Sequence, residues 1–338
     1  MNFGKIDNFV LLGGGSLVVH LIEELKKLNQ KIILITGQRN LDELISPTSI
    51  TFSQHLKENK IDYLVSENVN EDSHIEQKIT SNTLGISLGA PWILKEKFIK
   101  KFGGKLLNVH GARLPQDRGG GTTSWQILRN NKLGFCLIHK IEPGIDTGPI
   151  IKFKEFFYPP NCKVPKTFQE FYINENILFL REFINEILVK KDFDTINQPE
   201  YLSIYWPRLS TEHHSYIDWN WTLEEIELFI DAFDNPYKGA STFINNQRVF
   251  VKNCLINYND GCFHPFQQGI VYRKSIDSLF IAAKNGTLIL RDVKDEKGNN
   301  ILDRIKIGDR FFTPFKFLEE AKKFRAIYTS KGLKETSK

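Results

Sequence analysis

The sequence predicts an α/β protein in which a mostly parallel β-sheet is followed by a small β-barrel. Two patterns indicate this fold. Over roughly the first 205 residues, short apolar runs alternate with stretches of helical apolar spacing, as in consecutive βαβ units. Beyond about residue 240, short apolar runs follow one another directly and are separated by Asp-Gly and Asn-Gly turns.

The chain opens as a βαβ unit. Phe9 to Leu12 predicts a strand, Gly13-Gly14-Gly15-Ser16 begins an amphipathic helix that runs through Leu28, and Ile32 to Thr36 predicts a second strand. The glycines do not match the G-x-G-x-x-G spacing of dinucleotide-binding turns, and no acidic residue directly ends the second strand. We therefore expect these glycines to allow close packing between strand and helix.

The first domain, residues 1–205, continues in the same way. A helical stretch from Phe168 to Val189 precedes its end, and the strands before it make one twisted, mostly parallel sheet. Four further apolar runs predict these strands: Asp62 to Val65, Thr83 to Leu88, Lys105 to His110 and Gly134 to Ile141.

The second domain, residues 206–328, begins with helical apolar spacing from Leu223 to Phe233, which Asn235-Pro236 ends. Residues 329–338 are rich in Lys and Ser, and we expect them to form a disordered tail. Between these segments, runs punctuated by Asp260-Gly261 and Asn285-Gly286 predict strands at Phe250 to Ile256, Gly269 to Tyr272, Leu279 to Ala283 and Thr287 to Val293.

Composition favours a cytoplasmic protein without membrane association. With 338 residues, 41% hydrophobic and 25% charged, the chain can bury two ordinary cores. No apolar span reaches the length of a membrane helix, and the first residues lack the basic-then-apolar pattern of a secretory signal. Adjacent His213 and His214 have no third ligand nearby in sequence, so no metal site is predicted. The cysteines show no metal spacing and are expected to be reduced: Cys136, Cys162, Cys254 and Cys262.

One strand and one turn carry the chemistry. The predicted strand ends in Asn108-Val109-His110, and its alternation places Asn108 and His110 on one face; Asp146 follows 36 residues after His110. An amide can bind an oxyanion, an imidazole can move a proton, and a carboxylate can orient the imidazole. Because the motif holds no Ser or Cys nucleophile, direct attack by a substrate amine on an acyl donor fits better than a covalent enzyme intermediate. A structural alternative stays open, in which the three residues cap a turn, fill the core and close a Gly-rich turn.

These residues resemble the signature of the folate-dependent formyltransferases. The resemblance covers Asn108 to Gly119 (NVHGARLPQDRG) and Gly144 to Gly148 (GIDTG). A second stretch begins with Tyr205-Trp206-Pro207-Arg208-Leu209 and ends with the residues from Asn235 to Ala240. It is similar to the start of the carboxyl-terminal domain found in the family members that formylate methionyl-tRNA (the tRNA enzyme) and in some that formylate nucleotide-linked sugars. The resemblance implies a Rossmann-like catalytic domain followed by an OB-like barrel, joined with the help of Trp206 and Arg208.

Formyl transfer from N10-formyltetrahydrofolate to a primary amine is the reaction that the resemblance implies. Asn108 would hold the formyl oxygen, His110 would assist proton removal or stabilise the tetrahedral intermediate, and Asp146 would orient His110. No metal is implied, and a homodimer is expected from the family. The family's folate pocket maps, mainly through backbone groups, onto Trp92, Ile93, Leu94, Glu142, Pro143, Gly144, Ile145 and Asp146.

The expected acceptor is the amine of a nucleotide-linked amino sugar, a precursor of surface polysaccharide such as the O-antigen of lipopolysaccharide. Residues 206–338 hold 20 Lys plus Arg and 17 Asp plus Glu, a weak basic balance for tRNA, and residues 37–60 lack the basic insertion usual in the tRNA enzyme. Nucleic acid is therefore not an expected partner. Methionyl-tRNA formyltransferase is the alternative, and a non-catalytic folate- or nucleotide-binding module is the alternative of another class.

Three further residues surround the motif in sequence. Where many relatives have Ser-Leu-Leu-Pro after the histidine, this chain has Ala112-Arg113-Leu114-Pro115. Arg113 and Arg118 are expected to help select the acceptor. His139, in the predicted strand before Asp146, either approaches the substrate or packs against the sheet.

Overall fold

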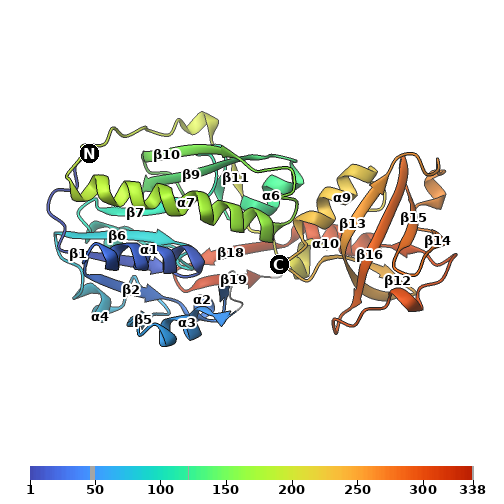
Figure 1. Ribbon diagram of the computed structural model, residues 1–338, viewed down its shortest axis with the longest axis horizontal. Coiled ribbons are helices and arrows are strands. Elements are labelled where there is room, and N and C mark those ends of the chain that lie inside the picture. Colours follow the sequence, from blue (N-terminus) through green and yellow to red (C-terminus); the bar gives the residue numbers. More distant parts are fainter. Residues whose placement is uncertain (46–49, 121, 337–338) are drawn as a thin grey trace.

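The computed structural model describes residues 1–45, 50–120 and 122–336. Two domains lie side by side along the long axis of the molecule (Figure 1). The amino-terminal domain is built on a seven-stranded sheet, and the carboxyl-terminal domain on a six-stranded antiparallel sheet. The predicted fold class, a mostly parallel sheet domain before a smaller β domain, is confirmed.

The amino-terminal sheet has the strand order β10-β9-β7-β6-β1-β2-β5. Its five strands from β7 to β5 are parallel, whereas β9 runs antiparallel to β7 and β10 antiparallel to β9. Strand β10 could not be predicted from the sequence, because Lys152, Lys154 and Glu155 interrupt its apolar pattern. The strands are β1 (Asn8–Gly13), β2 (Ile32–Thr36), β5 (Tyr63–Val65), β6 (Thr83–Leu88), β7 (Leu106–His110), β9 (Leu133–Lys140) and β10 (Ile150–Phe157).

Helices cover both faces of this sheet, so its central strands are buried on both sides. Phe9 and Leu11 of β1 belong to the core cluster that contains α1 (Ser16–Lys27) and α7 (Pro165–Leu188). Val10 and Leu12, one residue out of phase, belong to the cluster that contains α5 (Glu96–Lys100) on the opposite face. The shorter elements around the sheet are α2 (Gln38–Leu41), β3 (Leu44–Ile45), β4 (Ile50–Thr51), α3 (Phe52–Glu58), α4 (Ser73–Glu76), β8 (Arg118–Gly119) and α6 (Thr122–Leu128).

The glycines after β1 serve close packing, but at Gly13 the close neighbour is the end of strand β6 and not the expected helix. Gly13 has a φ of 127°, and a Cβ atom on it would lie 2.0 Å from the carbonyl oxygen of Leu88 at the end of β6. A Cβ on Gly14 would lie 2.7 Å from that of Asn40. Any side chain at Gly13 would overlap the Leu88 carbonyl, so only glycine lets the ends of β1 and β6 lie at their observed separation.

We expect Gly13→Ala to lower the free energy of unfolding by about 2–4 kcal/mol, because the backbone must move to relieve the overlap. Urea titration followed by circular dichroism measures this loss. Gly4→Ala is the matched control, since Gly4 also has a positive φ, 63°, but has open space around it. That variant should lose only about 1 kcal/mol for the left-handed backbone. Equal losses at the two glycines would show that contact with Leu88 is unimportant.

The carboxyl-terminal sheet is antiparallel and curled, with the order β14-β15-β16-β13-β12-β17. Its two edge strands meet: the amide of Val271 donates to the carbonyl of Asp309, and that of Phe311 to the carbonyl of Gly269, both at 2.8 Å. The expected small β domain is thus confirmed, while its OB topology stays a prediction. The elements are α9 (Leu223–Ala232), β12 (Ala240–Ile244), β13 (Gln247–Asn257), β14 (Val271–Lys274), β15 (Leu279–Ala283), β16 (Gly286–Asp295) and β17 (Phe311–Phe312).

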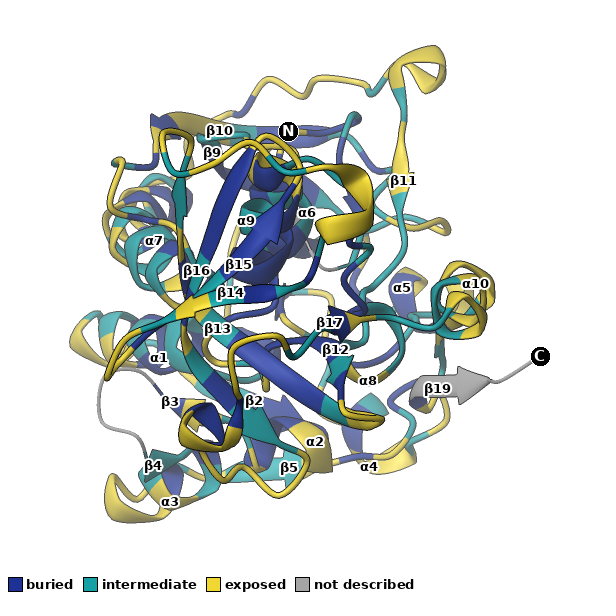
Figure 2. Cartoon of the chain, turned by 90° about the vertical axis from the view of Figure 1, so that its right-hand side faces the viewer, coloured by how far each residue is buried: buried dark blue, intermediate teal, exposed yellow. Residues whose placement is uncertain are grey.

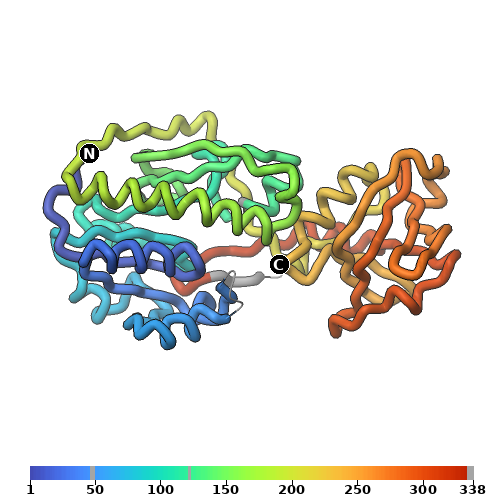
Figure 3. Tube along the Cα trace, viewed as in Figure 1, coloured from blue at the N-terminus to red at the C-terminus, as the bar shows by residue number. Residues whose placement is uncertain are grey.

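The expected disordered tail is wrong for residues 329–336. Helix α10 (Phe315–Lys323) is exposed (Figure 2). After it, strands β18 (Arg325–Thr329) and β19 (Gly332–Thr336) pair as an antiparallel hairpin. The segment that contains β18 runs back to the amino-terminal domain, as the red part of the chain trace shows (Figure 3), and the carbonyl of Thr329 accepts a 3.0 Å hydrogen bond from the amide of Ile93. Lys- and Ser-rich composition does not reveal such a distant backbone partner. Residues 337–338 lie outside the described residues.

His214 anchors the start of this hairpin. It ends the short helix α8 (Thr211–His214), its Nδ1 accepts a 2.8 Å hydrogen bond from the amide of Ser210, and its Nε2 lies 3.3 Å from the carbonyl oxygen of Phe324. A carbonyl only accepts, so the neutral ring with hydrogen on Nε2 satisfies both partners. Within the described part of the chain, no group of three or more His, Cys, Asp or Glu could hold a metal ion.

Acid should weaken this anchor. Burial lowers the pKa of His214, although its hydrogen bonds to the Phe324 and Ser210 backbone act in the opposite direction. The folded protein then binds a proton here less readily than the unfolded chain, so the stability contribution is present above about pH 6.5 and is lost as the pH falls below it. When the pH is lowered from about 7.5 to about 5.5, we expect the free energy of unfolding to fall less for His214→Gln than for the wild type. Parallel urea titrations at both pH values measure this, and identical losses would contradict it.

One further property concerns membranes. Across residues 1–45, 50–120 and 122–336, no helix is both long and apolar enough to cross a bilayer.

Candidate active site

The three predicted catalytic residues meet at the carboxyl end of β7. Asn108 and His110 come from β7, and Asp146 comes from the loop between β9 and β10. Asn108 Nδ2 lies 3.4 Å from Asp146 Oδ1, and His110 Nδ1 lies 3.8 Å from Asp146 Oδ2. The sheet therefore brings together an amide, an imidazole and a carboxylate that are separated by up to 38 residues in sequence.

His139 is a fourth member of this cluster. It stands directly opposite Asn108 in the antiparallel pairing of β7 and β9, and it is 2% exposed. Its Nδ1 lies 2.9 Å from the carbonyl oxygen of Lys140, so Nδ1 carries the hydrogen and Nε2 of the neutral ring accepts from Asn108 Nδ2 at 3.2 Å. The same Nε2 is 3.5 Å from Asp146 Oδ1. His139 thus orients the Asn108 amide instead of only packing against the sheet.

The ring of His110 is held in one tautomer by the backbone. Its Nε2 lies 2.8 Å from the carbonyl oxygen of Asp117, and this carbonyl can only accept. Nε2 therefore carries a hydrogen, and the neutral ring keeps its lone pair on Nδ1, on the side of Asp146. Asp117 is itself fixed, because its carboxylate accepts from Arg129 at 2.8 Å and from Trp206 Nε1 at 2.9 Å. His110 has a satisfied core contact, as the structural alternative requires, and a second nitrogen available for chemistry.

Asp146 is a buried carboxylate that stays ionised. Burial alone would raise its pKa, but the charge of His110 when its ring is protonated, the hydrogen bond and charge of protonated His139 and the amide of Gly119 together hold the pKa of Asp146 well below the usual range. The Gly119 amide donates to Asp146 Oδ2 at 2.9 Å. An ionised carboxylate can stabilise positive charge that develops on a neighbouring imidazole during proton transfer.

The turn that carries Asp146 is shaped by a close backbone approach. Asp146 has a φ of 54°, and a Cβ on Gly148 would lie 1.9 Å from the carbonyl oxygen of Lys140. Gln198 fixes the turn from outside, since its Nε2 donates to the carbonyls of Asp146 at 2.9 Å and of Gly148 at 2.7 Å. The sequence analysis does not identify Gln198, because a lone glutamine in a polar segment carries no local signal.

Arg113 and Arg118, which the sequence groups together, differ in their surroundings. Arg118 is 5% exposed, and its guanidinium binds Gln198 Oε1 at 3.2 Å and Glu200 Oε2 at 2.7 Å. It therefore supports the Asp146 turn through Gln198, and its expected part in selecting the acceptor stays a prediction. Arg113 is exposed.

A cavity of about 320 Å³ lies beside the four polar side chains. Seven of the eight residues predicted to hold folate line it; the exception is Pro143. Tyr205 and Tyr328, which the sequence analysis does not identify as pocket residues, also line it. The predicted residues on its wall are Trp92, Ile93, Leu94, Glu142, Gly144, Ile145 and Asp146, joined by Asn108, His110 and His139.

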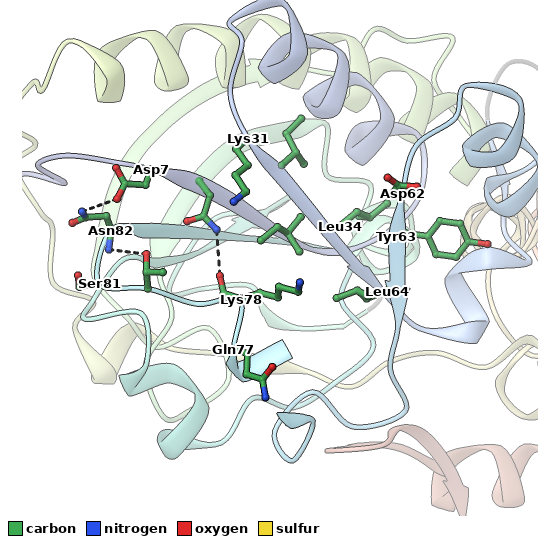
Figure 4. Close-up of a pocket in the computed structure, with 14 residues that line it drawn as sticks. Asp7, Lys31, Leu34, Asp62, Tyr63, Leu64, Gln77, Lys78, Ser81 and Asn82 are labelled. Carbon is green, nitrogen blue, oxygen red and sulfur yellow. Dashed lines mark hydrogen bonds between the residues drawn. The ribbon is translucent and has the colours of Figure 1, made fainter. Parts of the chain in front are cut away.

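A larger hollow, of about 600 Å³, lies at the opposite ends of the strands, where β1, β2 and β5 begin (Figure 4). Its wall includes Asn8, Ile32 and Tyr63, the first residues of β1, β2 and β5, and none of the predicted site residues. Parallel α/β sheets bind their ligands at the carboxyl ends of the strands. The smaller cavity beside Asn108 is therefore the candidate active site, despite its smaller volume.

Known proteins resemble this chain in sequence. The methionyl-tRNA formyltransferase of Ruminiclostridium cellulolyticum is 27% identical over 206 residues, 60% of this chain and 62% of that protein. The chain thus matches about three fifths of this relative's length. The methionyl-tRNA formyltransferase of Dictyoglomus turgidum is 26% identical over 223 residues, 63% of this chain and 68% of that protein.

Solved structures share the fold. An N-formyltransferase from Helicobacter canadensis, in complex with folinic acid and dTDP-3-aminofucose, has a TM-score of 0.65 and 19% identity, covering 85% of this chain and 99% of that one. WlaRD, a sugar 3N-formyl transferase solved with dTDP and 5-N-formyl-THF, also has a TM-score of 0.65 and 19% identity, covering 86% and 98%.

Two family models match the two domains in order. The model "Formyl transferase" matches residues 7–158, and the model "Formyl transferase, C-terminal domain" matches residues 210–303. The first match contains Asn108, His110 and Asp146. This chain belongs to the folate-dependent formyltransferase family.

Proposed function

We propose that this chain transfers the formyl group of N10-formyltetrahydrofolate to the primary amine of a nucleotide-linked amino sugar. The observation that carries the reaction is the convergence of Asn108, His110 and Asp146 on the wall of one cavity, with His139 behind them. A direct transfer needs an oxyanion donor, a proton acceptor and a charge that supports the proton acceptor, and this cluster supplies each of them.

In this mechanism the substrate amine attacks the formyl carbon while His110 Nδ1 takes a proton from the amine. Asp117 keeps Nε2 protonated, and Asp146 stabilises the imidazolium that results. Asn108 stabilises the negative formyl oxygen of the tetrahedral intermediate. Its 3.4 Å contact with Asp146 is the weaker of its two amide contacts, so this amide hydrogen turns to the oxyanion while His139 holds the other. The intermediate then collapses with cleavage of the bond between the formyl carbon and N10, and the His110 imidazolium returns its proton to N10 as tetrahydrofolate leaves.

The cavity fits a reduced pterin. The 92–94 and 142–146 segments both line it and can present peptide donors and acceptors to the polar edge of the ring, while Trp92 and Ile141 add apolar surface. Two solved structures that share the fold were obtained with folinic acid and with 5-N-formyl-THF. These observations support the assignment of the seven cavity-lining residues to folate.

The amino-sugar acceptor rests on two observations. The H. canadensis enzyme and WlaRD, whose chains match over nearly their whole length, were solved with dTDP-3-aminofucose and with dTDP. The carboxyl-terminal region has an excess of only three basic over acidic residues, which opposes a tRNA surface. Methionyl-tRNA is the second candidate acceptor, because the relatives with 26–27% identity described above are named methionyl-tRNA formyltransferases. The product would be a precursor of surface polysaccharide; the cytoplasmic location and the homodimer stay predictions.

Tetrahydrofolate release from N10-formyltetrahydrofolate tests the proposal. The purified chain is offered dTDP-, UDP- and GDP-linked 3-amino and 4-amino sugars and, separately, charged initiator methionyl-tRNA. Turnover with one sugar nucleotide, together with mass-spectrometric detection of the formylated sugar, supports it. Turnover with tRNA alone replaces the acceptor by the second candidate. Binding of 5-formyltetrahydrofolate without turnover on any amine would favour a non-catalytic module.

A further inference from the structure

The carboxyl-terminal hairpin reaches the candidate active site. Its strand β18 follows the second domain in sequence, yet Tyr328 lines the same cavity as Asn108 and His110. Tyr205, which enters from the connection between the domains, lines it too. The hairpin lies after residue 303, where the second family match ends, so the family models do not account for this part of the cavity wall.

Three contacts fix Tyr328 beside the cavity. Its hydroxyl accepts a 2.7 Å hydrogen bond from the guanidinium of Arg208. Its ring packs on Gly120, where a Cβ atom would lie 3.2 Å from Tyr328 Cε2. The adjacent Thr329 carbonyl binds the amide of Ile93 in the segment assigned to folate. Tyr328 is therefore held between Gly120, which directly follows the Gly119 bound to Asp146, and the 92–94 segment.

We propose that Tyr328 binds the aminobenzoylglutamate arm of N10-formyltetrahydrofolate, an inference that rests on the proposed function. With the pterin between the 92–94 and 142–146 segments, N10 must lie beside Asn108 for transfer to occur. The arm begins at N10 and must continue along the cavity wall away from the pterin. Tyr328 and Tyr205 are partly exposed aromatic side chains on that wall, and an aromatic ring packs well against a benzoyl ring.

Charge agrees with this assignment. The arm ends in carboxylates, and the guanidinium of Arg208 lies beside Tyr328, bonded to its hydroxyl and 6.0 Å from the ring centre. Because the hairpin bonds directly to Ile93, the ligand part nearest to it is the folate and not the amine acceptor. The hairpin thus completes the donor site, and the chain end contributes to binding of the one-carbon donor.

Calorimetric titration of the full chain with 5-formyltetrahydrofolate tests this role. We expect Tyr328→Ala to raise the Kd about tenfold, which corresponds to loss of an aromatic contact of about 1.4 kcal/mol. Tyr328→Phe keeps the ring and should bind within about threefold of the wild type. Ile327→Ala is the matched control, because Ile327 is the neighbouring residue of β18, is 46% exposed and points to the opposite face of the strand.

The outcomes separate the two proposals. Weaker binding of 5-formyltetrahydrofolate by Tyr328→Ala, with near-normal binding by Tyr328→Phe and Ile327→Ala, supports the inference. Unchanged binding by Tyr328→Ala overturns it, and so does equal weakening by Ile327→Ala, because the hairpin would then act only through stability. Equal weakening by Tyr328→Phe would overturn the ring contact. A wild type that does not bind 5-formyltetrahydrofolate would overturn the proposed function itself.

Discussion

Asn108→Ala should lower kcat/KM for formyl transfer by about 10²–10³-fold, the loss measured when one oxyanion donor is removed from an enzyme. The Asn108 amide is the neutral donor of the cluster, and His139 Nε2 fixes its orientation from behind at 3.2 Å. Removal of the amide leaves the negative formyl oxygen without a preorganised partner. Steady-state release of tetrahydrofolate measures the loss, and binding of 5-formyltetrahydrofolate should change much less because the oxyanion forms only in the transition state.

Asn8→Ala is the matched control for Asn108→Ala. Asn8 is a buried asparagine at the amino end of β1, where its Nδ2 donates to the carbonyl of Lys78 at 3.3 Å and its Oδ1 accepts from Thr83 at 2.7 Å. This variant also loses a side-chain amide from the same sheet, but at the amino ends of the strands, away from the cavity. It should unfold more easily and yet keep its kcat/KM. If Asn108→Ala retained wild-type kcat/KM, the oxyanion role would be excluded.

The strand that carries Asn108 and His110 could be predicted from the sequence because its signals are local. Two polar residues at alternate positions at the end of an apolar run must share a face, whatever surrounds them. The Gly-rich turn around Asp146 is likewise visible, since close backbone approaches such as that of Gly148 to Lys140 require glycine. The resemblance to a family then connects the strand and the turn, which composition and periodicity alone leave separate.

The rest of the site depends on contacts between distant segments. The apolar run of β9 does not show whether the strand runs parallel or antiparallel, and only the antiparallel register places His139 opposite Asn108. Gln198 acts through hydrogen bonds to backbone carbonyls 50 and 52 positions away. Tyr328 reaches Arg208 across 120 positions. Such pairings leave no periodic pattern near the residues that make them, so single-sequence reasoning misses them.

Asp146→Asn should lower kcat/KM on the order of 10³-fold, near the middle of the range for general acid–base catalysis. Asparagine matches the shape of the side chain and can still accept the hydrogen bond from the Gly119 amide, so the turn should survive. The negative charge disappears, and the imidazolium of His110 loses its stabilising partner 3.8 Å away. Asp7→Asn is the matched control, because it makes the same substitution at the amino ends of the strands, where Asp7 accepts a hydrogen bond from Asn82. It should leave kcat/KM unchanged.

The stability of Asp146→Asn provides a second readout of the same charge. The pKa of Asp146 in the folded protein lies below its value in the unfolded chain, so the ionised carboxylate stabilises the fold at neutral pH. This contribution is present above about pH 3.9 and is lost as the pH falls toward the folded-state pKa. We therefore expect Asp146→Asn to unfold at lower urea concentration than the wild type at neutral pH, with the difference shrinking in acid. A pH-independent difference would mean that the ionised form is not favoured by His110 and His139, and the electrostatic role of Asp146 in catalysis would fail with it.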